Sequence, residues 1–294
     1  VPSFFVVSGY LFAAHFDYMQ PLKRLSRTSK RLATLYLFWC LFYLLPYNVA
    51  LIPVDGWGAP VKFAHWHFYM WTLSWENFLF GGAKTQLWFL PALLCAAVIS
   101  TPFIYLRKIG YLLVLGLILF GAALLSSPYR ETPVGFDPGF FTRNGPFLST
   151  VFFASGVFMA QENGEPRNRL LLGYVLTGVG LAWHLAEALW LKQHYDGPTI
   201  YDFNSGTLAF GIGAAMLGIY GAKPLQSRWL VENAKYSLGI YLLHMLVMDL
   251  LYPLNRIWAS TVLWSLVLPV LTIFLTLQLV KVLLRYAPLR RVLS

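Results

Sequence analysis

The sequence has few charged residues and almost no cysteine, and both shortages exclude common classes of protein. Charged residues make up 12% of the 294 positions, about half the share usual in soluble domains. The two cysteines, Cys40 and Cys95, both lie in apolar runs. They read as small buried hydrophobic residues, so neither a disulfide framework nor a cysteine metal site is expected.

Acidic residues are also scarce, which leaves a net charge of +10. In a soluble protein this excess of positive charge would suggest binding to nucleic acid. Here the basic residues stand in short loops between apolar runs, which is the pattern that sets the orientation of a membrane protein. We therefore expect membrane lipid around the chain and no nucleic acid.

What the sequence has in their place is long apolar runs, several of them close to the roughly 20 residues that cross a bilayer. The runs are continuous instead of alternating, which favours helices over a membrane barrel. We predict an all-α polytopic bundle that forms one integral membrane domain over residues 1–294. The nine predicted spans are 1–16, 31–52, 86–106, 110–126, 146–161, 170–191, 205–222, 236–252 and 262–284.

The loops between these spans alternate in charge. The odd-numbered connections and the C-terminal tail hold 16 of the 22 basic residues, among them Lys223, Arg228 and Arg291. The positive-inside rule places these segments in the cytoplasm and residue 1 outside. We expect one more helix upstream, within roughly 30–50 further residues, and ten spans in the parent protein.

The second connection, residues 53–85, is rich in tryptophan and tyrosine, which prefer the membrane interface. We expect it to lie on the outer surface or to dip into it. His65 and His67 stand two residues apart, so on a helix they would not share a face. A metal site is not expected there.

Three polar residues follow one stripe of the eighth span. Ser237, Tyr241 and His244 are spaced i, i+4 and i+7, which puts them on one helix face. At that depth the stripe should face the bundle interior or a water-filled cavity. Chemistry alone leaves two interpretations open, a functional site or hydrogen-bonding contact between helices.

Two further groups lie at opposite sides of the predicted bundle. Arg24 and Arg27, three residues apart in the most basic loop, can converge on a phosphate or simply anchor the helix at anionic lipid. His184 and Glu187 stand three residues apart near the outer end of the sixth span. Glu187 is a functional candidate because a carboxylate in a span is costly; a structural His–Glu pair is the alternative.

Two loop motifs complete the set. Arg143, followed by Asn and Gly, precedes the fifth span and could bind an anion or cap the helix start. A plain interfacial turn is the alternative. Gly81 and Gly82 come shortly before Trp88, in a segment that enters the third span. The glycine pair indicates a hinge.

Together these segments resemble the acyltransferase 3 family of integral membrane acyltransferases. The similar motifs, in chain order, are FFxxSGY at 4–10, RxxR at 24–27, paired glycines at 81–82, LWFL at 87–90, RNG at 143–145 and SxxxYLxH at 237–244. The resemblance covers about residues 1–250.

The resemblance implies transfer of an acyl group, usually acetyl, from cytoplasmic acyl-CoA to a hydroxyl of a surface polysaccharide or lipid-linked glycan in a bacterial inner membrane. Within the family, the chain resembles the stand-alone O-acetyltransferases, and this resemblance implies a reaction that needs no metal. The family's RxxxxxxxxxxH motif, whose histidine is the expected base, precedes FFxxSGY and matches no position here. We expect it in the upstream helix.

The resemblance also implies roles for the residues that are present. The donor side comprises Arg24, Arg27, Gly81, Gly82 and Trp88. The supporting catalytic residues comprise His244, Tyr241, Ser237, Glu187 and Arg143, the last two towards the glycan. The rival interpretations are a transporter or flippase, for which no internal repeat is visible, and a non-catalytic membrane partner.

Overall fold

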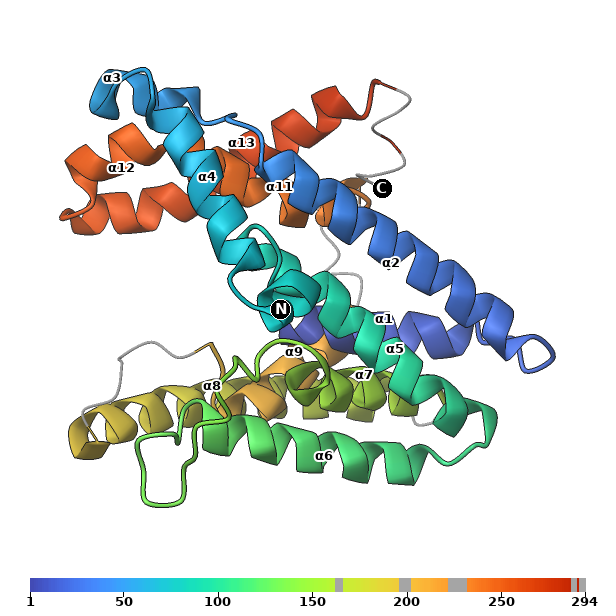
Figure 1. Ribbon diagram of the computed structural model, residues 1–294. Coiled ribbons are helices and arrows are strands. Elements are labelled where there is room, and N and C mark those ends of the chain that lie inside the picture. The colour runs from blue at the N-terminus through green and yellow to red at the C-terminus, as the bar shows by residue number, and fades with distance from the viewer. Residues whose placement is uncertain (162–165, 196–201, 222–231, 287–289, 291–294) are drawn as a thin grey trace. The chain divides into compact units, whose positions relative to one another are not determined.

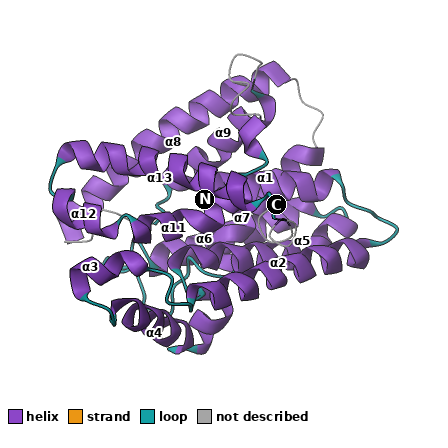
Figure 2. Cartoon of the chain, turned by 90° about the horizontal axis from the view of Figure 1, so that it is seen from above, coloured by secondary structure: helices purple, strands orange, loops and turns teal. Residues whose placement is uncertain are grey.

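The computed structural model describes residues 1–161, 166–195, 202–221, 232–286 and 290. Every regular element among them is a helix (Figures 1 and 2), which confirms the predicted all-α fold. The basic residues Lys223, Arg228 and Arg291 lie outside the described residues. Contacts divide the chain into two compact units, one of Val1–Ala33 and Phe89–Leu225, the other of Thr34–Trp88 and Gln226–Ser294.

The first unit is a bundle in which α1 packs along α7 and α8 packs along α9. Its core includes Phe12, Phe153 and Val157, which bury their side chains against one another. The elements of this unit are α1 (Pro2–Ala14), the first turns of α2 (Pro21–Tyr43), α5 (Phe89–Tyr105), α6 (Ile109–Ser126), α7 (Pro146–Gln161), α8 (Pro166–Tyr195) and α9 (Gly206–Tyr220).

Two glycines explain how closely α1 and α7 approach. A Cβ atom on Gly9 would lie 2.0 Å from the carbonyl oxygen of Phe153, and one on Gly156 would lie 1.9 Å from that of Val6. Small residues let helix backbones approach one another in membrane proteins, where the hydrophobic effect does not drive helices together. The glycine of the FFxxSGY motif is therefore a packing residue in this fold.

The second unit is built around α11, which packs against α13. The chain bends by 61° between α11 and α12, so the predicted span 236–252 ends in a break. The elements of this unit are the rest of α2, η1 (Val49–Leu51), α3 (Ile52–Asp55), α4 (Ala59–Thr72), the π-helix η2 (Asn77–Gly81), η3 (Thr85–Trp88), α11 (Ser237–Leu250), α12 (Tyr252–Trp258) and α13 (Val262–Leu283).

Four helical segments of the described chain are long and apolar enough to cross a membrane, or five if the bent α11–α12 pair is one span. Their outward faces are apolar: Val262, Leu266, Val270 and Phe274, one turn apart on α13, are all exposed by more than half. Apolar rows of this kind suit contact with lipid. The helices α1, α7 and α9 have 13, 16 and 15 residues and are short for a core about 30 Å thick, so nine spans stay a prediction.

Most predicted bounds agree with the helices, and one is wrong. The predicted span 146–161 coincides with α7, and 110–126 differs from α6 by one residue. The predicted span 31–52 instead corresponds to α2, which begins at Pro21 and ends at Tyr43. Proline is favoured in the first helical turn, whereas Pro46 disfavours a helical conformation in the residue before it.

Candidate active site

Within the second unit, the polar stripe of α11 contacts the segment that leads into α5. The hydroxyl of Tyr241 donates to the backbone carbonyl of Gln86, and the amide of Gln86 donates to the carbonyl of Leu242 at 3.4 Å. Nδ1 of His244 lies 2.7 Å from the carbonyl of Tyr241. A carbonyl can only accept, so Nδ1 carries the proton and Nε2 of a neutral His244 is left as an acceptor.

Ser237 occupies the first turn of this helix, and its hydroxyl donates to the carbonyl of Ala234 at 2.6 Å. The ring centroids of Tyr241 and His244 are 5.8 Å apart. The three predicted residues therefore lie on one helix as expected. The Tyr241–Gln86 hydrogen bond also fits a purely structural contact between two segments. The catalytic role of the stripe therefore stays a prediction.

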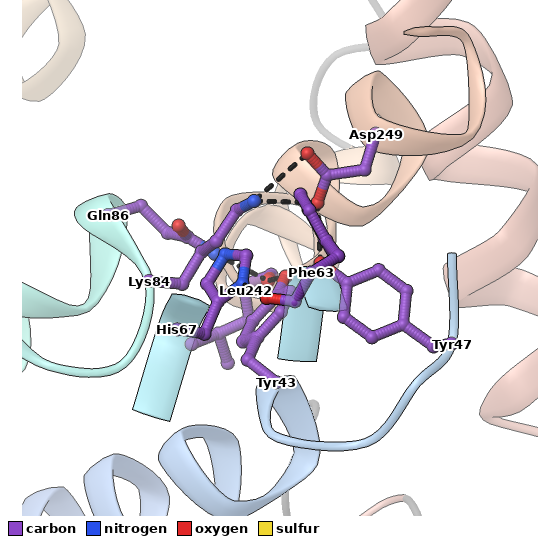
Figure 3. Close-up of polar contacts among 8 residues, drawn as sticks. All are labelled: Tyr43, Tyr47, Phe63, His67, Lys84, Gln86, Leu242 and Asp249. Atoms are coloured by element: carbon purple, nitrogen blue, oxygen red, sulfur yellow. Dashed lines mark hydrogen bonds and ion pairs between the residues drawn. The ribbon is translucent and has the colours of Figure 1, made fainter. Parts of the chain in front are cut away.

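A buried ion pair joins the same two segments further along α11. Figure 3 shows the ammonium of Lys84 between the carboxylate oxygens of Asp249, with Nζ at 2.7 Å from Oδ2 and 2.9 Å from Oδ1. The Tyr47 hydroxyl donates to the same carboxylate at 2.5 Å. The Lys84 ammonium also lies 4.9 Å from the centre of the Phe63 ring, a cation–π contact.

The electrostatics of this cluster follow from its burial. Burial, and then the negative charge of Asp249, raises the pKa of Tyr47 above its ordinary value. Burial lowers the pKa of His67, and the nearby Lys84 lowers it further, against the opposing effects of Asp249 and a bond to a backbone carbonyl. That bond, 2.8 Å from Nδ1 to the carbonyl of Phe63, fixes the proton on Nδ1. His67 is therefore held neutral, with Nε2 as an acceptor.

The paired glycines mark the turn that delivers this segment. Gly82 has a φ of +83°, and a Cβ there would lie 2.7 Å from the Cβ of Leu87. Glycine adopts this left-handed conformation without a steric penalty. Gly81 closes the π-helix η2, and Trp88 is buried. The structure gives these residues a role in the turn and the core; their predicted contact with the donor stays a prediction.

In the first unit, the RxxR arginines occupy the first two turns of α2. Arg27 is exposed, and the guanidinium of Arg24 lies 5.8 Å from the ring of Phe12. Nε of Arg24 is buried and has no hydrogen-bond partner among the described residues. Two cations in the first turns of a helix, near the positive end of its dipole, fit a phosphate.

Glu187, on α8, is bonded to the start of α9 and to a loop. Its carboxylate accepts from the hydroxyls of Tyr129 and Ser205, each at 2.6 Å, and from the backbone N–H groups of Ser205 and Gly206 at 3.1 and 3.2 Å. His184 lies instead against the hydroxyl of Thr207 at 3.0 Å. The structure thus shows Glu187 as a cap of the start of α9, with His184 on another partner, and a functional role of Glu187 stays a prediction.

Arg143 lies on the segment before α7, and its Nη1 is 2.8 Å from Oδ2 of Asp202. Asp202 precedes Ser205 by three residues, so Arg143 and Glu187 are bonded to the same short stretch of chain. The predicted outer residues of the first unit are thus brought together. A carboxylate already stands against the Arg143 guanidinium, and the predicted roles of Arg143 stay predictions.

The cluster of Figure 3 contains five residues that the sequence did not single out: Tyr43, Tyr47, Lys84, Gln86 and Asp249. It also contains His67, which the sequence singled out only to argue against a metal site. The sequence contains one signal for this cluster. Asp249 is an ionisable residue inside an apolar run, and such a residue is a candidate for a functional site. The partner, Lys84, is 165 positions away. No group of three or more metal-ligating side chains is found in the part of the chain that the structure describes.

Apolar helices whose outward faces suit contact with lipid define a multi-pass membrane protein. Over residues 1–281 the chain matches the acyltransferase 3 family, described as an acyltransferase domain. The chain belongs to this family, and it is an acyltransferase. Neither a curated protein nor a solved structure matches it significantly.

Proposed function

We propose that the chain transfers an acyl group, acetyl in the simplest case, from cytoplasmic acyl-CoA to a hydroxyl of a surface polysaccharide or lipid-linked glycan. The observation that carries the proposal is the hydrogen bond from Tyr241 to Gln86. It joins the segment of the LWFL motif to the SxxxYLxH helix, two motifs that the family resemblance assigns to one reaction and that lie 155 positions apart.

The reaction moves one acyl group from sulfur to oxygen. The acceptor oxygen attacks the thioester carbonyl carbon, the carbon–sulfur bond breaks, and the hydroxyl proton ends on the thiol of CoA. The step needs a base with a pKa near neutrality, for which histidine is suited. We assign His244 a supporting role, in which it orients the donor, stabilises the oxyanion or relays the proton.

The donor would lie with its phosphates at Arg24 and Arg27. The buried, unpartnered Nε of Arg24 and the start of α2 support a bidentate contact to phosphate. In the second unit, Oε1 of Gln86 is also buried without a hydrogen-bond partner among the described residues. It is an unused acceptor beside the α11 stripe. The charge distribution supports a bacterial cytoplasmic membrane with the C-terminus inside.

The donor assignment is tested by replacing Arg24 and Arg27 together with alanine. A charge-assisted hydrogen bond contributes about 1.5–3 kcal/mol, so we expect the KM for acyl-CoA to rise about tenfold or more. The control, Lys23→Ala with Lys30→Ala, removes the same charge from the same helix without the RxxR geometry. Equal donor KM values in the two double variants would defeat the assignment.

The function itself is tested by mass spectrometry of surface glycans from cells with and without the full-length gene. We expect base-labile acetyl esters that depend on the gene, and purified protein should consume acyl-CoA only when a glycan acceptor is supplied. A glycan that is moved across the membrane but never acylated would overturn the proposal.

A further inference from the structure

A pocket of about 290 Å³ opens in the first unit between the end of α6, the segment before α7 and Asp202. The segment before α7 and Asp202 belong to connections that the charge pattern predicts on the outer side of the membrane. Its floor includes the buried pair Ser126 and Thr142, whose hydroxyls are 2.9 Å apart. The volume is just under the range of about 300–1,000 Å³ usual for ligand pockets.

The charges that line the pocket are already paired. Arg130 is bonded to Asp137, and its Nε also lies 3.8 Å from Oε1 of Glu131. Arg143 is bonded to Asp202 at 2.8 Å. Each guanidinium therefore already faces at least one carboxylate, and the site carries no excess of positive charge. A phosphate or another anion would meet two carboxylates here. Strong donors and strong acceptors stand side by side, and a hydroxyl group uses both at once.

Two aromatic rings stand beside these polar groups. Phe140 and Phe141 both line the pocket, and the side chain of Phe141 is 71% exposed. An exposed ring offers a flat apolar surface with little conformational freedom to lose on binding. Sugar rings present hydroxyl groups at their edges and C–H groups on their faces, so paired charges beside an aromatic ring match both.

Hydrogen bonds to Glu187 connect the two chain segments that line the pocket. Glu187 bonds Tyr129, at the beginning of the 127–145 segment, and Ser205, which follows Asp202 in the chain. Burial, and then Glu187, raises the pKa of Tyr129 to about 12, so its hydroxyl stays protonated and donates throughout the ordinary pH range. A site whose walls are fixed before binding loses less entropy when it binds.

We propose that this pocket is the acceptor subsite, which binds one or two neutral sugar residues through Arg130, Arg143 and their aspartates while Phe141 stacks on a ring. The proposal rests on the proposed function, because it names where that function's acceptor lies. Glu187 is then a positioning residue: it holds the two walls together and does not itself contact the sugar.

The test uses two single variants of the full-length protein, Phe141→Ala and Asp202→Asn. The control is Phe136→Ala, which removes an exposed ring from the same segment that does not line the pocket. For each protein the KM for the glycan acceptor and the KM for acyl-CoA are measured separately. We expect the pocket variants to raise the acceptor KM about tenfold and to leave the donor KM unchanged, with no effect of Phe136→Ala.

Binding is measured independently of catalysis, by saturation-transfer NMR with maltotriose, chitotriose and mannotriose and with their phosphorylated forms. At least one neutral trisaccharide should bind, more tightly than its phosphorylated form, and should lose binding in both pocket variants. Active protein whose variants keep the wild-type acceptor KM overturns the subsite and leaves the proposed function standing. Failure of every neutral trisaccharide to bind, or equal binding by the variants, overturns the subsite whether or not the protein is active.

Discussion

The buried pair of Lys84 and Asp249 allows a sharp test of how the second unit is held together. The exposed fractions of the two side chains are 7% and 14%, so neither charge has much access to water. The replacement Asp249→Asn keeps the shape of the side chain and an acceptor for Tyr47. It removes only the negative charge and leaves the Lys84 ammonium buried without its counter-ion.

The magnitude follows from the burial of the pair. Breaking a buried ion pair by removing one partner costs about 3–5 kcal/mol, because the remaining charge is left uncompensated. At about 2–4 °C per kcal/mol, the unfolding temperature of the unit should fall by on the order of 10 °C. The double variant Lys84→Met with Asp249→Asn removes both charges, keeps an acceptor for the Tyr47 hydroxyl, and should recover most of this loss, because no ion is then left buried.

The chain supplies its own reporter for the measurement. Cys40 is fully buried in the second unit, and Cys95 is the only other cysteine. In a Cys95→Ala background, a thiol-reactive fluorogenic dye labels the protein only when Cys40 becomes accessible. The midpoint of labelling against temperature therefore reports the unfolding of this unit in detergent.

An exposed ion pair in the same unit is the matched control. Arg256 and Asp55 are 3.3 Å apart, with 57% and 46% of their side chains exposed, and such pairs contribute about 0–1 kcal/mol. Asp55→Asn should therefore hardly move the midpoint. The reasoning from burial is refuted if Asp249→Asn lowers the labelling midpoint no more than Asp55→Asn does. It is also refuted if the double variant has as low a midpoint as Asp249→Asn alone.

Two further predictions each compare a test variant with a control variant at a second residue of the same type. Gly156→Ala places a Cβ against the carbonyl of Val6 and should cost at least about 1–3 kcal/mol. Gly121→Ala, which has open space around its Cβ, should be neutral or stabilising. The temperature midpoint for the loss of helical circular dichroism in detergent measures both. Because the folded pKa of His67 is lowered, the stability of the second unit should be full above about pH 6.5 and fall as the pH drops towards the folded pKa. His67→Asn should flatten this dependence and His65→Asn should not; parallel curves for wild type and His67→Asn contradict the assignment.

The helices could be predicted where composition alone decides their ends. The apolar runs of α6 and α7 stop at charged or turn-forming residues, so hydropathy found both to within one residue. It shortened α8, which continues to Tyr195 through Lys192 and His194, because a helix can extend past the apolar region with its backbone bonds intact. Hydropathy also misplaced α2. This helix begins at Pro21, and because basic residues occupy its first turns, those turns do not stand out as apolar.

The site could be predicted only as far as local spacing reaches. Tyr241 and His244 share a helix face, as the spacing required, but the residue that Tyr241 bonds, Gln86, lies 155 positions away. The Lys84–Asp249 pair has no local pattern at all. Its one visible trace is a carboxylate in an apolar run, and the identity of its partner depends on tertiary packing.

The outcome at Glu187 shows why spacing is a weak guide to partners inside an apolar bundle. A bond to His184 would satisfy one oxygen of the carboxylate, whereas the start of α9 and Tyr129 together supply two hydroxyls and two backbone N–H groups. Each bond to a charged group contributes about 1.5–3 kcal/mol, and the N-terminus of a helix leaves its first N–H groups without intrahelical partners. Four such donors outcompete one imidazole, and His184 turns to Thr207 instead. The partner of Glu187 is therefore decided by the start of α9, which lies 18 positions further along the chain, and not by the histidine one turn away.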